Sequence, residues 1–147
     1  MARAADREDL LRRLGHIRAQ SPRRWGRMNA HQMICHLSDS FGSVLGIRSA
    51  ARGGSAFERI VIKRVALYGP VPWPRGFRTR PEVDQEKEGT PPGDFAADLE
   101  RLKQRFTQFA ELDDFPYPHP MFGRMTRNQW LRWGYLHMNH HLRQFGV

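Results

Sequence analysis

Along much of the chain, apolar residues recur every three or four positions, which is the spacing of one face of an α-helix. The apolar members of the first such stretch are Leu10, Leu11, Leu14 and Ile17. With arginines filling the other side, the stretch predicts a helix from about Asp6 to Ala19. Ser21 and Pro22 would end it, because proline disfavours helical geometry in the residue before it.

A second helix is expected to open at Asn29. Asparagine is a favourable N-cap, and Gln32 lies three residues on, where a capping box places a Glu or Gln. The apolar stripe that follows consists of Ile34, Leu37, Phe41 and Val44. Because glycine weakens helices, this helix is expected to fade before Gly53 and Gly54.

Residues 55–68 predict a third, shorter helix, in which Ser55 and Glu58 form another capping box. Its expected apolar face consists of Phe57, Ile60, Val61, Val65 and Tyr68. A strand through residues 60–62 is the alternative, but the two basic residues that follow interrupt both alternation and a continuous apolar run.

The segment from Pro70 to Pro92 carries six of the ten prolines and is expected to be an extended loop. Loops of this length are commonly functional or disordered. Trp73 and Phe77 suggest that the loop packs on the body of the protein.

The two remaining helices have clear start signals. Asp94 is an N-cap, and Thr126 forms a third capping box with Gln129. The stripe after Asp94 steps through Phe95, Leu99, Leu102, Phe106 and Phe109. The stripe of the last helix steps through Trp130, Gly134, His137 and His141. That helix is expected to run to about Gln144 and to end at Gly146.

Four main amphipathic helices predict an all-α fold, a four-helix bundle. Residues 55–68 would add a short extra helix, and the proline-rich loop would be an insertion between the second and third helices of the bundle. The length of 147 residues suits one domain, expected over residues 1–147.

The apolar runs are short, and the single cysteine indicates a reducing compartment. No run approaches the roughly 20 apolar residues of a membrane span. The segment from Met1 to Leu14 is charged and has no apolar signal region. Cys35 cannot form an internal disulfide and is expected to be a small buried residue. A cytoplasmic protein, not associated with membranes, is therefore expected.

The net charge of +9 comes mainly from arginine. A basic surface attracts nucleic acids or anionic substrates, which leaves a nucleic-acid-binding protein as one alternative. The basic groups are short and dispersed, however, and neither paired-cysteine fingers nor a basic region leading into heptads is present. No specific binding of nucleic acid is therefore expected.

The histidines of the last helix carry the sharpest chemical signal. His137 and His141 are four residues apart on the stripe that should face the core, so both imidazoles can reach one metal ion. The alternative is that His137 is a buried histidine bonded to a carbonyl group, and that His140 and His141 lie on the surface.

A tight site needs a third ligand and groups that orient the rings. His36 is the best candidate, because it alone lies well inside a predicted core helix, with Asp39 three residues on as an orienting partner. The alternative for His36 is a core histidine with no metal. His31 should face elsewhere, His16 is near a helix end, and His119 could line the mouth of a site.

Three segments resemble the DinB/YfiT-like superfamily, in particular a branch of uncharacterised function. They are residues 33–39 (MICHLSD), 119–123 (HPMFG) and 137–144 (HMNHHLRQ). The resemblance implies a four-helix bundle with a metal site formed by His36, His137 and His141, with His140 on a non-ligand position. Gln144, like Asp39 and His119, is then a candidate for orienting a ligand or lining the pocket.

Characterised relatives in that superfamily are transferases and isomerases that use thiols such as bacillithiol, mycothiol or glutathione. This chain reads His-Leu-Arg-Gln where the commoner ending is His-Arg-Gly-Gln, and it adds the proline-rich insertion, which should reshape the pocket. Arginines that could hold an anionic cosubstrate are Arg75, Arg124 and Arg143.

Together these features predict a divalent-metal enzyme acting on a small molecule, such as a thiol-dependent transferase or a hydrolase. Zinc suits three imidazoles best, while nickel, iron and manganese are the other options. A metal-free helical protein that acts as an interaction partner or homodimer is the alternative from a different class.

Overall fold

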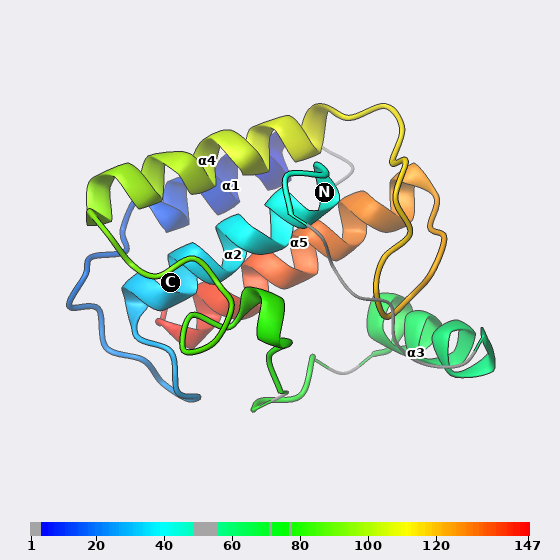
Figure 1. The fold of residues 1–147 in the computed structure, drawn as a ribbon, viewed down its shortest axis with the longest axis horizontal. Coiled ribbons are helices and arrows are strands. Elements are labelled where there is room, and N and C mark those ends of the chain that lie inside the picture. The colour runs from blue at the N-terminus through cyan, green and yellow to red at the C-terminus, as the bar shows by residue number, and fades with distance from the viewer. Residues whose placement is uncertain (1–3, 49–55, 71, 77) are drawn as a thin grey trace.

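The computed structural model describes residues 4–48, 56–70, 72–76 and 78–147, except for the side chains of residues 56–59. The protein is all-α, as predicted, with one 3-10 turn and no strand among these residues (Figure 1). The helices are α1 (Ala4–Leu14), α2 (Ala30–Val44), α3 (Ala56–Tyr68), α4 (Phe95–Glu111) and α5 (Arg127–Gln144), and the 3-10 turn is η1 (Pro81–Val83). No helix in the described part of the chain has the length and apolarity needed to cross a membrane.

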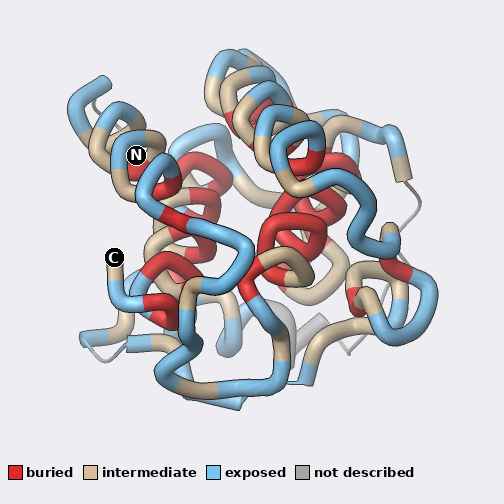
Figure 2. The backbone as a smooth tube through the Cα atoms, turned by 90° about the vertical axis from the view of Figure 1, so that its left-hand side faces the viewer, coloured by how far each residue is buried: buried red, intermediate tan, exposed pale blue. Residues whose placement is uncertain are grey.

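The helices share one apolar core, to which α3 contributes Leu67. α2 packs along α4, α1 packs against α5, and α2 also meets α5 (Figure 1). Buried positions gather on the inward sides of the helices (Figure 2). The centre of the core is aromatic, and its rings include Phe41, Phe106, Phe109, Trp130 and Trp133.

The predicted capping signals determine where three of these helices begin. The Asn29 side chain accepts from the Gln32 amide at 2.8 Å, and Gln32 accepts from the Asn29 amide at 2.9 Å. Thr126 and Gln129 form the same reciprocal pair, and Asp94 caps α4. Because each cap satisfies amides that have no partner within the helix, it sets the residue at which the helix starts.

The first helix is shorter than predicted, since α1 ends at Leu14 and not near Ala19. The chain passes from Gly15 into turns in which the His16 and Ile17 amides bond to carbonyls three residues back. Glycine is a poor helix former, and the tighter bonds close the last turn. Ile17 is nevertheless fully buried, so the predicted apolar stripe is right although the helix boundary is wrong.

The second helix also ends early. α2 stops at Val44, and Gly46 adopts a φ of +76°, a left-handed conformation that favours glycine. The predicted end near Gly53 and Gly54 lies outside the described residues.

The predicted apolar face of α3 is wrong. Ile60, Val61, Val65 and Tyr68 are all exposed, whereas Leu67 is buried. The physical reason is the position of α3, which lies to the side of the other helices and contacts α5 (Figure 1). Of the other predicted positions, Ser55 and the side chains of Phe57 and Glu58 lie outside the described residues.

The proline-rich loop packs on the body, as Trp73 suggested. The Trp73 indole donates to the Ala66 carbonyl at 2.7 Å, and its ring lies 5.9 Å from that of His137. The loop differs from the prediction in containing η1. Phe77 lies outside the described residues.

Gly134 is required where α5 crosses α4. A Cβ on Gly134 would lie 2.4 Å from a ring carbon of Phe109, which is fully buried. We expect Gly134→Ala to lower the free energy of unfolding by about 1–3 kcal/mol, because overpacking outweighs the better helix propensity of alanine. Urea denaturation would measure this change.

Gly42→Ala is the comparison variant, because the nearest atom to its added Cβ is a guanidinium nitrogen of Arg105 at 3.1 Å, a milder contact than the 2.4 Å at Gly134. We expect Gly42→Ala to lower the free energy of unfolding by less than Gly134→Ala does. Equal stability of the two variants would contradict the close helix crossing.

Candidate metal centre

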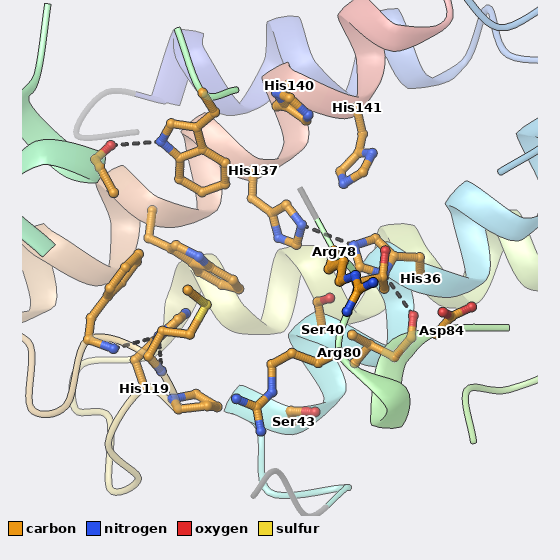
Figure 3. Close-up of a pocket in the computed structure, with 18 of the residues that line it drawn as sticks. His36, Ser40, Ser43, Arg78, Arg80, Asp84, His119, His137, His140 and His141 are labelled. Carbon is orange, nitrogen blue, oxygen red and sulfur yellow. Dashed lines mark hydrogen bonds between the residues drawn. The ribbon is translucent and has the colours of Figure 1, made fainter. Parts of the chain in front are cut away.

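His36 from the middle of α2 and two histidines of α5, His137 and His141, converge in one place (Figure 3). One ring nitrogen of each lies within 4.8 Å of those of the other two. The Nε2 atoms of His36 and His137 are 3.2 Å apart. All three side chains are buried.

Two of the rings are held in a defined tautomer. His36 Nδ1 donates to the Val83 carbonyl at 2.8 Å, and His141 Nδ1 donates to Gln144 Oε1 at 2.9 Å. The Gln144 amide nitrogen donates in turn to the Trp25 carbonyl, which identifies Oε1 as the acceptor. With the proton on Nδ1, each Nε2 has a free lone pair, the form in which histidine binds a metal.

The orienting partner of His36 is therefore Val83 in η1, and the expectation that Asp39 would orient it is wrong. Asp39 is fully buried and faces the proline-rich loop. It accepts from the Thr90 amide at 2.7 Å and from Arg48 and Gln85. Its physical role is to hold the loop on α2, which brings the Val83 carbonyl within reach of His36.

His137 packs among aromatic rings, and its ring centre lies 5.1 Å from that of Trp133 and 5.9 Å from that of Trp73. Its Nε2 faces His36, while its Nδ1 is buried and has no hydrogen-bond partner among the described residues. The position of this ring is thus set by aromatic packing.

Burial lowers the pKa of all three histidines. Neighbouring rings lower the pKa of His137 and His141 further, since each would be a second positive charge. For His36, the bond to Val83 and the nearby carboxylates of Asp39 and Asp84 partly oppose the effect of burial. The cluster is consequently held neutral at neutral pH, as metal ligands must be.

One separation in the cluster matches that between two ligands of a divalent metal ion. Nitrogen ligands of a tetrahedral zinc ion lie 2.0–2.1 Å from the metal, and therefore about 3.3 Å from each other. The 3.2 Å between the His36 and His137 Nε2 atoms is close to this separation.

His140 is near the centre but is not part of the convergent set. Its ring meets His141 edge-on at 5.2 Å and lies between Trp25 and Trp73. The turn of the helix directs His140 away from the point on which its neighbour converges. His16, another histidine considered from the sequence, is exposed beyond α1.

The three histidines line one wall of a cavity of about 1320 Å³. α3 contributes an apolar wall through residues such as Val61 and Val65, whose side chains the sequence had placed in the core. Arg78 and His119 also line this cavity (Figure 3). A large, partly apolar cavity beside convergent polar groups is typical of a small-molecule site.

A second cluster, which the sequence did not predict, joins α2 to α4. His31 Nε2 and Cys35 Sγ lie 2.7 Å and 3.5 Å from one oxygen of Asp98, which is buried. That oxygen also accepts from the Gly93 amide, and the other pairs with Arg101 at 2.8 Å. Burial raises the pKa of the Cys35 thiol to about 12. The cluster is already satisfied within the protein, so it is a structural contact between helices.

Residues 7–146 match the family described as "Protein of unknown function (DUF1569)". The chain belongs to this family. The match spans all three converging histidines and extends far beyond the short segments on which the DinB/YfiT-like resemblance depended. No curated protein and no solved structure matches the chain.

The DinB/YfiT-like identification is therefore wrong. The segments that suggested it are short, and their histidine spacing reflects helix geometry: residues four apart share a face in any helix. The thiol-dependent transferase activity that the resemblance implied loses its basis. DUF1569 itself comes with no assigned activity.

Proposed function

We propose that this protein is a metal-dependent enzyme acting on a small molecule, with His36, His137 and His141 as ligands of a divalent ion. The observation that carries the proposal is the convergence of three neutral imidazoles on the wall of a large cavity. Structural zinc sites are closed by four protein ligands, whereas catalytic sites have three and leave one position for water or substrate.

A bound divalent ion supplies Lewis-acid chemistry, in which a coordinated water or thiol becomes a nucleophile at neutral pH. The residues of the chain supply the rest. Val83 and Gln144 keep the lone pairs of His36 and His141 directed at the site. The ring of Trp73 packs beside that of His137, with their centres 5.9 Å apart. Hydrolysis and group transfer are the reaction classes that suit this arrangement.

Three neutral nitrogen donors suit zinc best, with nickel, iron and manganese as the other options. A small molecule is the partner that the cavity fits. Nucleic-acid binding has less support, since three of the arginines that line the cavity, Arg27, Arg48 and Arg80, pair with carboxylates of the protein itself.

We expect protein purified without chelator to hold about one divalent transition-metal ion per chain. Elemental analysis would measure it, followed by calorimetric titration of chelated protein with zinc and with nickel. A protein that has no metal as purified and takes up neither ion would disprove the proposed function.

A further inference from the structure

His119 is held in a defined tautomer by its own turn. The backbones of His119 and Gly123 exchange two hydrogen bonds of 2.9 Å, which close the turn. Inside it, His119 Nδ1 accepts from the amides of Met121 and Phe122 at 3.1 and 3.2 Å. Backbone amides can only donate, so Nδ1 has no proton and Nε2 carries it.

The ring that carries this Nε2–H is fixed and neutral. It stacks on Phe122 at 4.3 Å with an interplanar angle of 11°, and it touches Trp130 and Trp133. His119 is 8% exposed, and burial, with the charge of Arg80, lowers its pKa to about 3. No nitrogen, oxygen or sulfur atom of the described residues accepts a hydrogen bond from Nε2.

The cavity that His119 lines is the cavity of the three-histidine centre. The Trp133 ring contacts both places, because its centre lies 5.2 Å from the ring of His119 and 5.1 Å from the ring of His137. A molecule with one end at the metal ligands can therefore reach His119 by extending past a single indole ring.

Arg78 adds a positive charge to the same cavity. Three other cavity arginines have carboxylate partners, as described above, but Arg78 has none in the part of the chain that the structure describes. Figure 3 shows its guanidinium group directed into the cavity. A guanidinium group prefers the oxygens of a carboxylate or phosphate.

We propose that His119 is a substrate-positioning residue, which donates its Nε2–H to an oxygen of a carboxylate-bearing small molecule in the cavity. Arg78 contributes the opposite charge, and α3 offers an apolar wall to the body of the molecule. This proposal rests on the proposed function for one point, namely that the reacting end of the bound molecule lies at the three histidines.

A neutral imidazole suits this role because its donor cannot be lost by titration near neutral pH and cannot rotate away. Because Nε2–H has no acceptor among the described residues, it is available to an oxygen of a molecule bound in the cavity.

Two substitutions test the roles of the two ring nitrogens of His119 separately. His119→Asn places a carbonyl oxygen where Nδ1 was, which keeps the acceptor of the turn and removes the donor to the cavity. His119→Gln places its amide group where Nε2 was, which keeps the donor and loses the acceptor of the turn. Arg78→Gln removes the charge alone.

The probes are phenylacetate and its neutral analogue phenylacetamide, titrated into zinc-loaded and into chelated protein with calorimetric detection. We expect His119→Asn to weaken phenylacetate binding about tenfold, and His119→Gln to weaken it less. Arg78→Gln should weaken phenylacetate but not phenylacetamide. The affinity for zinc should be unchanged in all three variants.

Nuclear magnetic resonance of the unaltered protein gives a second test, which does not depend on whether the variants fold. The histidine ¹H–¹⁵N spectrum should show His119 protonated at Nε2 and not titrating between about pH 5 and 8. Phenylacetate should shift the Nε2–H signal.

The proposal is overturned if His119 titrates in that range, if phenylacetate does not bind, or if His119→Asn binds it like the unaltered protein. If phenylacetate binding requires zinc but is unaffected by His119→Asn, the carboxylate binds the metal ion and not His119. Failure to bind zinc would disprove the proposed function, but the effect of His119→Asn would still be measurable in chelated protein, so the two failures are distinguishable.

Discussion

Replacing His36, His137 or His141 by alanine, one at a time, is expected to lower the affinity for zinc more than about 100-fold. Loss of a group that only orients a ligand costs 10–100-fold, and loss of a ligand removes one of three metal bonds. Combining two of these substitutions should add little, because groups that act as a unit are not additive. Metal titration of the single and double variants would measure these losses.

His140→Ala is the matched control, since its ring contacts His141 but lies outside the convergent set. It should retain the metal. All four variants should keep their helicity by circular dichroism, because the apolar core does not depend on the ion. Metal loss in His140→Ala together with metal retention in His36→Ala would show that the ligand set is wrong.

Asp39→Ala is expected to lower the free energy of unfolding by about 3–5 kcal/mol, the range for breaking a buried ion pair. The Asp39 carboxylate is fully buried between Arg48 and Arg105, which lie 3.2 and 3.6 Å away. Its removal leaves the Thr90 amide without its acceptor and takes the compensating negative charge away from both guanidinium groups. Urea denaturation would measure the loss.

The same substitution should weaken zinc binding about tenfold, because the loop would no longer hold Val83 against His36. Asp113→Ala is the control, since the Asp113 side chain is fully exposed, and it should change neither quantity. An Asp39→Ala protein with normal stability would contradict the role of this carboxylate as the anchor of the loop.

The three histidines that converge could be inferred from the sequence because their placement depends on local geometry. The capping residues Asn29 and Thr126 set where α2 and α5 begin, and the helical period then fixes which side chains share a face. The spacing of His137 and His141 puts both on one face of α5. The same locality explains the error in the family resemblance, because a spacing that any helix produces is weak evidence of ancestry.

The environment of His36 could not be inferred in this way. Val83 lies 47 residues from His36, and the bond between them depends on how the proline-rich loop crosses α2. The exposed side of α3 likewise depends on where that helix lies relative to the body. The tautomer of His119 depends on the path of five residues through a turn.

The sequence by itself thus determined the all-α character, the helix starts and the three histidines on inward-facing stripes. These properties arise from interactions within about four residues, which the order of amino acids specifies directly. Only the tertiary structure decided that Val83 orients His36, that Asp39 anchors the loop, and that His119 faces the same cavity as the three converging histidines. Those contacts join residues distant in the chain, and their geometry exists only after the core has packed.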